Sequence, residues 1–380
     1  MRIGLLTDGY RPGVNGVIRL IIQHKRALEE LGHQVFVFTC GRPDPEDEPE
    51  VIRSPGMPFL KPGYTIGLRY TRAAQAVLRT LDLLHAHQPA LSGWLALRYG
   101  RRYDLPVVCT AHTRYDLLAA TRLSFLPPSF LRAVLRLYMG WFTRRCDLLT
   151  APTPQAAQVM YDLGAARPIA VVPTGIETAA YRHPRRRLTR QDLGLSEDAP
   201  LSVFIGRLEP EKNLPFLLEA LARPEAGRSN LLLVGEGPER QPLETLAARL
   251  GLNGRVHFAG QVEAADLPDY IALADLFVTA SRIEVMPLTV LEALAGGLPI
   301  VGPDLPWIWS AVQPQVNGLL APVEAEPFAR VWGTVASDPH LRARLAAGAR
   351  ASSERYDVRN TTALMVEHYQ QVIEKHRRRR

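Results

Sequence analysis

Short apolar runs alternate with amphipathic stretches over the first half of the chain. Residues 2–7 are mostly apolar and predict a buried strand. Apolar positions between 17 and 31 recur at helical spacing, and Gly32 ends that stretch before the apolar run 35–38. Further apolar runs follow, with helical stretches between them, at 83–86, 105–109, 148–151 and 169–172. This alternation predicts β-α-β units in a parallel, doubly wound α/β sheet.

The pattern breaks at 181–187, a polar and basic segment that we interpret as a linker. A second series of expected strands then occupies 201–206, 231–234, 256–258, 276–279 and 299–301. We therefore expect a Rossmann-like domain over 1–180, a second over 181–355, and a C-terminal helix with a basic tail over 356–380. Such domains bind ligands at the carboxyl ends of their strands, which predicts an active site between the two.

The composition agrees with a multidomain globular protein. The chain has 380 residues, 47% of them hydrophobic, which excludes a disordered or a small disulfide-stapled protein. Cys40, Cys109 and Cys146 are far apart and form no CxxC, so neither a zinc ribbon nor a disulfide framework is indicated. No apolar run reaches the length of a membrane-spanning helix, and Asp8 interrupts the N-terminal run too early for a signal peptide. These features favour a cytoplasmic protein.

The net charge of +7 is unevenly distributed. Residues 1–180 hold 21 lysines and arginines against 14 acidic residues, residues 181–360 hold 19 against 22, and residues 361–380 hold 5 against 2. The excess in the first half and the tail fits a surface that attracts an anionic partner, such as nucleic acid or lipid headgroups. A compositional bias toward arginine is the alternative.

Several loops at strand ends could bind phosphate. The segment 7–16 joins the first strand to a helix and is rich in glycine, although a structural turn explains it equally well. The segment 206–213 places Arg207 and Lys212 on a strand-to-helix loop, where both cations can converge on a diphosphate; ordinary surface charge is the alternative. Gly235 lies in a third glycine turn after a strand.

The segment 284–299 carries the sharpest pattern. Glu284 lies in the loop before a helix and Glu292 lies two turns later on the same face. Such carboxylates can accept hydrogen bonds from sugar hydroxyls, while the first N–H groups of the helix can face phosphate. A solvated helix face is the usual alternative for a lone E-x7-E pattern.

Taken together, these motifs resemble those of retaining glycosyltransferases of the GT-B fold in family 4 (GT4), over nearly the whole chain. The matching segments are 7–16, 82–87, 111–113, 172–177, 206–213 and 284–297. The resemblance implies two Rossmann-like domains that face a deep cleft, with the C-terminal helix crossing back to the first domain. The motifs are nearest to those of diacylglycerol glucosyltransferases and phosphatidylinositol mannosyltransferases.

The resemblance also implies roles for individual residues. His112 corresponds to an active-site histidine that contacts the transferred sugar, and Arg207 and Lys212 would hold the donor diphosphate. Glu284 would contact the sugar hydroxyls, Glu292 the ribose and Gly16 the phosphates. The expected catalytic group is thus His112, Arg207, Lys212 and Glu284, and the remaining donor contacts are Gly16, Gly235, Val262, Met286, Pro287, Leu288 and Glu292. For the acceptor we expect Tyr10, Arg114 and Tyr115.

Two departures from the family pattern are mild. The segment 174–177 reads Thr-Gly-Ile-Glu where Asn-Gly-(Val/Ile)-Asp is usual, and 285–287 reads Val-Met-Pro where a glycine is common. They leave the donor sugar open. Because Arg207, Lys212 and helix N-termini can stabilise a leaving diphosphate, we expect no metal site and no required cofactor. The resemblance implies retention of configuration, and we favour front-face attack within an ion pair.

The region after His112 suggests a lipid acceptor. Residues 112–116 resemble the His-Thr-x-Tyr segment of diacylglycerol-glycosylating GT4 enzymes, and in 125–145 aromatic and aliphatic residues alternate with arginines. Such a helix can lie in a bilayer interface, as could the Arg377–Arg380 tail; a core helix with solvated arginines is the alternative.

We thus predict transfer of a hexose, most simply glucose, from a UDP- or GDP-sugar to a lipid such as diacylglycerol at the cytoplasmic membrane face. A GT4 enzyme with a soluble or polysaccharide acceptor, and a GDP-mannose-dependent lipid mannosyltransferase, are the alternatives. A nucleic-acid-binding module would need a recognised fold motif, and the sequence has none, so we expect no nucleic-acid partner.

Overall fold

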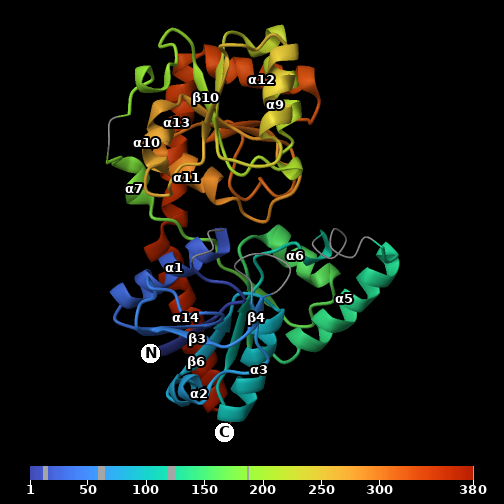
Figure 1. Ribbon diagram of the computed structural model, residues 1–380, viewed down its shortest axis with the longest axis vertical. Coiled ribbons are helices and arrows are strands. Elements are labelled where there is room, and N and C mark those ends of the chain that lie inside the picture. The colour runs from blue at the N-terminus through green and yellow to red at the C-terminus, as the bar shows by residue number, and fades with distance from the viewer. Residues whose placement is uncertain (12–15, 59–64, 118–124, 186–187, 380) are drawn as a thin grey trace. The chain divides into compact units, whose positions relative to one another are not determined.

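The computed structural model describes residues 1–11, 16–58, 65–117, 125–185 and 188–379, and the chain forms two compact units (Figure 1). The first unit comprises Met1–Gly175 together with Val358–Arg380, and the second comprises Ile176–Asp357. Each unit is built on one parallel sheet.

The sheet of the first unit has the strand order β3-β2-β1-β6-β7-β8-β9, and every pairing in it is parallel. β4 and β5, which follow β3 in the sequence, form a separate two-stranded antiparallel ribbon. The strands are β1 (Arg2–Leu6), β2 (Gln34–Cys40), β3 (Val51–Ser54), β4 (Met57–Pro58), β5 (Thr65–Ile66), β6 (Leu83–Ala86), β7 (Val107–Thr110), β8 (Leu148–Ala151) and β9 (Ile169–Val171). The helices are α1 (Gly16–Glu30), α2 (Arg72–Leu78), α3 (Leu91–Tyr103), α5 (Pro128–Thr143), α6 (Pro154–Asp162) and α14 (Val358–Arg377).

Side chains that alternate along these strands form two apolar layers, one on each face of the sheet. Ile3 and Leu5 of β1 pack with side chains of α1 and α14, whereas Leu6 packs with side chains of α2, α3 and α5. Since a parallel sheet buries both faces, both layers are needed. The C-terminal helix therefore belongs to the first unit, as the family resemblance implied.

The sheet of the second unit has the order β12-β11-β10-β13-β14-β15 and is also parallel. Its strands are β10 (Leu201–Ile205), β11 (Asn230–Val234), β12 (Val256–Gly260), β13 (Leu276–Val278), β14 (Ile300–Pro303) and β15 (Gly318–Ala321). Its α-helices are α7 (Thr178–Arg182), α8 (Leu214–Leu221), α9 (Arg240–Arg249), α10 (Leu267–Leu273), α11 (Leu288–Gly296), α12 (Ala325–Ser337) and α13 (Pro339–Ser353), and its 3₁₀ turns are Gln191–Leu193, Pro210–Lys212, Pro224–Ala226 and Glu354–Tyr356.

Both strand orders place the first strand of the unit in the middle of its sheet, which is the Rossmann-like arrangement. The predicted α/β class with two such sheets is confirmed. Two edge strands, β3 and β15, do not appear among the predicted ones. Arg53 interrupts the apolar character of β3, which therefore lacks the apolar run of a central strand. β15 is a short apolar run, Gly-Leu-Leu-Ala, that is not among the predicted strands.

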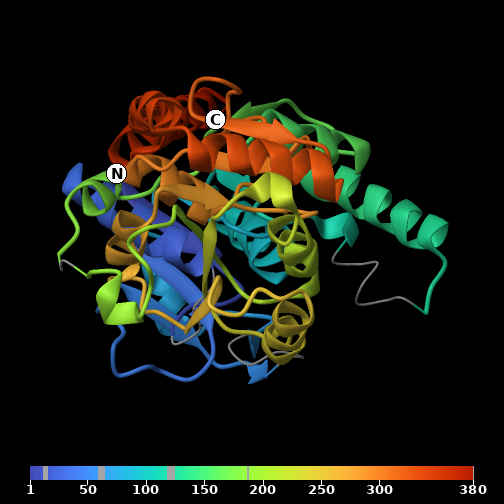
Figure 2. The ribbon, with the colours of Figure 1, turned by 90° about the horizontal axis from the view of Figure 1, so that it is seen from above.

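Two further features bear on the sequence analysis. Cys40, Cys109 and Cys146 are all buried as free thiols. Every helix within the described ranges is either too short or too polar to cross a membrane. Helix α5, coloured teal-green, stands out from the sheet of its own unit in both Figure 1 and Figure 2.

Candidate functional site

The predicted site residues fall into two groups, one in each unit, and each group is described within its own unit. Arg207, Lys212, Gly235, Glu284 and Glu292 belong to the second unit. Gly16, His112 and the predicted acceptor residues belong to the first.

The loop after β10 positions the two predicted phosphate-binding cations. It ends in the 3₁₀ turn Pro210–Lys212, and Asn213 then adopts a left-handed backbone with φ 55° before α8 begins at Leu214. Asparagine tolerates this conformation better than most residues, so the sequence favours a sharp turn directly after Lys212.

Lys212 is held by Glu284, as the ammonium contacts the Glu284 carboxylate and each side chain has an exposed fraction of 16%. A backbone bond ties the two loops together, because the Arg282 N–H donates to the Glu211 carbonyl at 2.9 Å. The structure therefore brings Lys212 and Glu284 together from loops 72 residues apart in the sequence. A cation and a carboxylate at one place can contact a phosphate and a sugar hydroxyl respectively.

Arg207 lies on the same loop but is far more exposed, with an exposed side-chain fraction of 63%. Its guanidinium contacts the Glu209 carboxylate and lies 3.6 Å from that of Glu211. Exposed pairs of this kind are held weakly, so Arg207 can exchange these partners for another anion at little cost.

Glycine is required where the loop after β11 meets the loop after β10. Gly235 has φ 141°, and a Cβ built there would lie 1.9 Å from the carbonyl oxygen of Gly206. The Leu208 N–H also donates to the Glu236 carbonyl at 2.9 Å. The predicted glycine turn therefore fixes the backbone just ahead of Arg207.

The remaining predicted donor contacts lie along α11 or against the core. Glu292 lies within α11 and is almost fully buried, and Pro287 caps the N-terminus of that helix. Val262, Met286 and Leu288 are partly buried and pack against the apolar core that includes α11. Sequence reasoning thus located Glu292 on the right helix, and the structure adds that its carboxylate is buried rather than on a solvated face.

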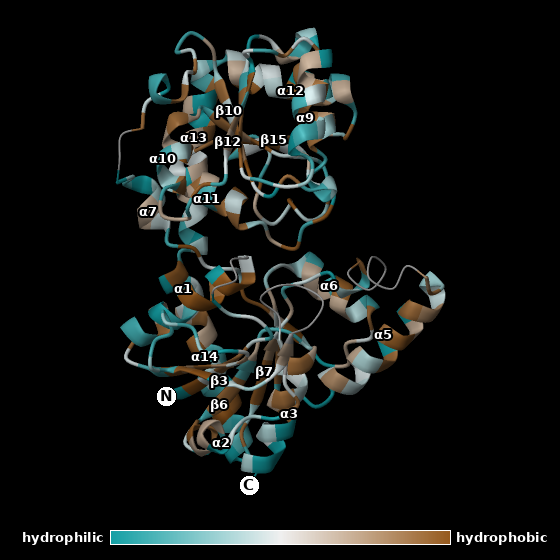
Figure 3. Cartoon of the chain, in the orientation of Figure 1, coloured by the Kyte–Doolittle hydropathy of each residue, from teal (hydrophilic) through white to brown (hydrophobic). Residues whose placement is uncertain are grey.

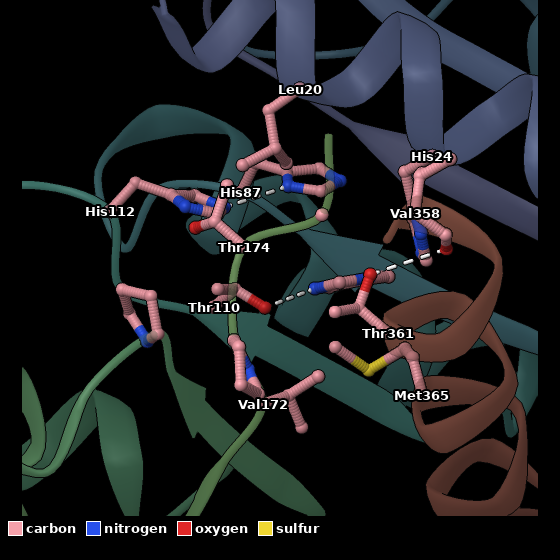
Figure 4. Close-up of a pocket in the computed structure, with 14 residues that line it drawn as sticks. Leu20, His24, His87, Thr110, His112, Val172, Thr174, Val358, Thr361 and Met365 are labelled. Carbon is pink, nitrogen blue, oxygen red and sulfur yellow. Dashed lines mark hydrogen bonds between the residues drawn. The ribbon is translucent and has the colours of Figure 1, made fainter. Parts of the chain in front are cut away.

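In the first unit, His112 follows β7 and is one of four histidines around a cavity of about 40 Å³ (Figure 4). Its Nε2 is 3.1 Å from Nδ1 of His87, which follows the neighbouring strand β6, and the two rings are stacked with an interplanar angle of 16°. The other two are His85, within β6, and His24, within α1. Among the described residues, no cluster of histidine, cysteine and carboxylate side chains has the geometry of a metal site.

A buried chain of hydrogen bonds fixes His85. Its Nε2 is 2.6 Å from the Thr110 hydroxyl, and its Nδ1 is 2.6 Å from the hydroxyl of Tyr369 in α14. The Tyr369 hydroxyl is in turn 3.2 Å from Nε2 of His24. The chain therefore links the middle of the sheet to both helices that cover this face.

Burial keeps all four imidazoles neutral near pH 7. It lowers the pKa of His24 to about 4 and that of His112 to about 4. It also lowers the pKa values of His85 and His87 well below the ordinary value. His112 can therefore meet a ligand as a neutral hydrogen-bonding group rather than as a cation.

Sequence reasoning missed three members of this cluster. His24, His85 and His87 received no role, although His85 and His87 lie in a motif that carried the family resemblance. A signal was present, because His87 and His112 both directly follow predicted parallel strands, and the ends of such strands lie on the same edge of a sheet. The partner role of Tyr369 had no comparable signal.

The predicted acceptor residues and Gly16 lie in different environments. Tyr10 is buried in the apolar layer beneath α1 and α14, which raises the pKa of its hydroxyl. Arg114 forms an ion pair with Asp116 at 2.7 Å, and Tyr115 packs against a small cluster that includes Met139. Gly16 is the exposed first residue of α1, while residues 12–15 of the predicted glycine loop lie outside the described residues.

Comparison with known families divides the chain in two. The family described as Glycosyltransferase Family 4 matches residues 14–180, and the family described as Glycosyl transferases group 1 matches residues 185–352. Together they include every predicted site residue except Tyr10.

Two curated relatives and one solved structure are similar over most of their length. A Xylanimonas cellulosilytica protein named D-inositol 3-phosphate glycosyltransferase is 30% identical, over 93% of this chain and 91% of its own. A Streptococcus pneumoniae protein named alpha-monoglucosyldiacylglycerol synthase is 29% identical, over 84% of this chain and 75% of its own. The Anabaena protein HepE, solved with UDP and glucose, has a TM-score of 0.76 at 22% identity, covering 98% of this chain and all of that one. This likeness confirms the predicted GT-B fold class.

The histidine cluster predicts that acid destabilises the first unit. In the unfolded chain His24 and His112 would titrate near 6.5, whereas burial lowers their pKa to about 4 in the folded unit. Between these values the unfolded chain binds more protons, so the free energy of unfolding should fall by up to about 1.4 kcal/mol per pH unit for each group. The loss should begin as the pH drops below 6.5.

Peptide-resolved hydrogen exchange at pH 7.5 and pH 5.5, corrected for intrinsic rates, measures this effect. Protection of β6 and β7 should fall more than protection of β10 and β11, because none of the second unit's histidines, His183, His257 and His340, is buried. Equal losses in the two units would contradict the prediction.

Proposed function

Because the chain belongs to the GT4 family of glycosyltransferases, we propose that it transfers glucose from a nucleotide-sugar to a lipid acceptor such as diacylglycerol, at the cytoplasmic face of a membrane. Membership of this family makes the chain a nucleotide-sugar-dependent hexosyltransferase. The identity of the sugar, the acceptor and the place of action is the part that we propose.

The proposal of a lipid acceptor rests on one observation, which is the exposed apolar face of α5. Phe130, Val134, Leu137 and Trp141 follow one another at intervals of four, three and four residues, which aligns them along one side of the helix. Their exposed fractions are 54%, 46%, 75% and 37%. Figure 3 shows brown, hydrophobic segments of α5 alternating with white and teal ones.

A separate face of α5 attaches the helix to its unit. Leu131, Met139 and Phe142 are buried, and Phe142 belongs to the apolar layer under α2 and α3. Folding therefore accounts for the inner face and leaves the outer stripe unexplained. An apolar stripe of this size on the surface is typical of a site that binds a membrane or a protein.

Exposed arginines along α5 and directly after it favour a membrane. Arg132, Arg136, Arg144 and Arg145 are all exposed, and the guanidinium of Arg145 lies 4.6 Å from the ring centroid of Trp141. Apolar side chains that enter the headgroup region beside arginines that meet anionic lipids form an interfacial helix. The similarity to a protein named alpha-monoglucosyldiacylglycerol synthase supports the same proposal.

The donor would bind to the second unit. Lys212 and Arg207 can stabilise the negative charge that develops on a nucleoside diphosphate leaving group, and Glu284 beside Lys212 can accept hydrogen bonds from sugar hydroxyls. His112 of the first unit would contact the transferred sugar. We propose front-face attack by the acceptor within an ion pair, with retention of configuration.

A soluble acceptor is the second candidate. It is favoured by the similarity to a protein named D-inositol 3-phosphate glycosyltransferase, which extends over 93% of this chain at 30% identity. This enzyme would share the donor chemistry and differ in what approaches the first unit.

A product screen separates the two candidates. We expect incubation with UDP-glucose and diacylglycerol vesicles to yield a glucosylated lipid, detected by mass spectrometry of the organic phase. UDP-galactose and GDP-mannose, and phosphatidylinositol and inositol phosphate as acceptors, complete the screen. A sugar product confined to the aqueous phase would contradict the lipid proposal and support the second candidate.

Loss of either member of the partly buried Lys212–Glu284 ion pair should strongly impair transfer. We expect Lys212→Ala and Glu284→Ala each to lower kcat by at least about 100-fold, since removing one preorganised charge-stabilising group typically costs that much. Arg330→Ala removes an exposed cation that pairs with Glu326 and serves as the matched control. Circular dichroism should show that all three variants fold, and full activity in either test variant would overturn the site assignment.

The outer face of α5 should control membrane binding. We expect Phe130→Glu combined with Leu137→Glu to weaken sedimentation with phosphatidylglycerol vesicles at least about tenfold, because each large apolar side chain contributes about 1.5 to 3 kcal/mol when buried. Leu31→Glu changes another exposed leucine of the same unit and is the control. Transfer to a short-chain, water-soluble diacylglycerol should survive in the double variant. Unchanged vesicle binding would contradict the membrane role of α5.

A further inference from the structure

We propose that His87 is a positioning residue for His112, whose ring orientation and tautomer it sets through the hydrogen bond between its Nδ1 and the Nε2 of His112. This inference rests on the proposed function, in which His112 contacts the transferred sugar. Nothing in the sequence motifs gives His87 a role of its own.

The geometry of the pair is set by the sheet. β6 and β7 are parallel neighbours with Ala86 opposite Cys109, so the residues that follow them emerge at the same edge. The two rings lie 5.3 Å apart between centroids and only 16° from parallel, with the linking nitrogens 3.1 Å apart. The pair is therefore both stacked and hydrogen-bonded, which leaves the His112 ring little freedom to rotate.

Because each neutral ring carries one N–H, the hydrogen bond between His87 and His112 links their tautomers. Burial keeps both imidazoles neutral, and a neutral imidazole carries one N–H and one bare nitrogen. One ring must donate and the other accept, so the state of His87 decides whether the Nδ1 of His112 is protonated. Because Nδ1 is the nitrogen of His112 that this bond leaves available, His87 determines whether His112 can offer a ligand a donor or an acceptor.

His87 is itself held firmly. Its side chain is 1% exposed, and its ring lies 4.4 Å from that of His85, which Thr110 and Tyr369 fix by hydrogen bonds. A rigid supporting residue is what precise placement of a contacting group requires. The charged and titratable groups that face the pair from the packed elements are His85 on β6, His24 on α1 and Tyr369 on α14.

The other nitrogen of His87 points to a water site. Within the described part of the chain, His87 Nε2 is buried and has no hydrogen-bond partner. His87 lines the cavity of about 40 Å³, together with the polar side chains of Thr110 and Thr174 (Figure 4). A cavity of this size has room for about two or three water molecules, one of which can satisfy Nε2.

Three substitutions at position 87 separate positioning from packing. In His87→Asn the amide occupies the place of Nδ1 and can keep the bond to His112. In His87→Gln the amide reaches toward the place of Nε2 and the cavity instead, while His87→Leu fills the volume and makes no hydrogen bond. Because glutamine is nearer to histidine in size than asparagine is, a packing role would favour glutamine and a positioning role would favour asparagine.

The measurements are steady-state transfer kinetics and histidine ¹⁵N NMR at pH 7.5. We expect His87→Asn to keep kcat within about threefold, and His87→Gln and His87→Leu to lower kcat about tenfold or more with KM for the donor changed less than about threefold, since a misplaced contacting group acts on the transition state. In NMR, His112 should be a single neutral tautomer in the wild type and in His87→Asn, and a mixture of tautomers in the other two variants.

The outcomes distinguish this inference from the proposed function. Transfer activity absent from the wild type, or retained in full by His112→Ala, would overturn the proposed role of His112. An active wild type, an inactive His112→Ala, and wild-type kcat with one His112 tautomer in both His87→Gln and His87→Leu would overturn the positioning role alone.

Discussion

The first unit depends on covering both faces of a parallel sheet, and the chain can do so only with its last helix. One face of β1 is covered by α2, α3 and α5, whereas the other needs α14 beside α1. The fully buried Tyr369 fixes α14 in place, because its hydroxyl is within hydrogen-bond distance of His85 in β6 and of His24 in α1. The same contact that completes the fold therefore also fixes the base of the histidine cluster.

This arrangement explains which parts of the molecule the sequence could predict. Central strands such as β1 and β10 are buried on both faces, so they appear as continuous apolar runs. The edge strand β3 contains Arg53 and is only partly buried, so it lacks such a run, whereas β15 is a short apolar run whose pairing with β14 no local pattern indicates. Periodicity reports which face of an element is buried and is silent on which distant element covers it.

The candidate site likewise has features that the local sequence predicts and others that depend on distant packing. Arg207 and Lys212 share the loop between β10 and α8, so their place at the end of a strand follows from the sequence alone. The contact between His85 and Tyr369 spans 284 residues and depends on how α14 packs, which no local pattern encodes. The role of His87 lay between these cases: adjacent parallel strands bring it to His112, but the ring geometry needed the structure.

Electrostatics gives the two cations of the second unit different capacities. Lys212 is largely buried, so its pair with Glu284 orients both groups before any ligand arrives. Arg207 is mostly exposed, and its ion pairs with Glu209 and Glu211 are therefore weak. A preorganised charge and an adaptable one are complementary, because the first sets the position of an anion and the second can follow it as its charge changes.

Part of the excess positive charge of the first half lies on and directly after α5. Its arginines could serve a nucleic acid as well as a membrane, since aromatic side chains beside cations also bind single strands. The outer stripe, however, includes Val134 and Leu137, the latter 75% exposed, and aliphatic side chains cannot stack on bases. Burial in the acyl region of a bilayer is the environment that suits both the aliphatic and the aromatic members of the stripe. The chemistry of the stripe, rather than the net charge, therefore favours a lipid surface.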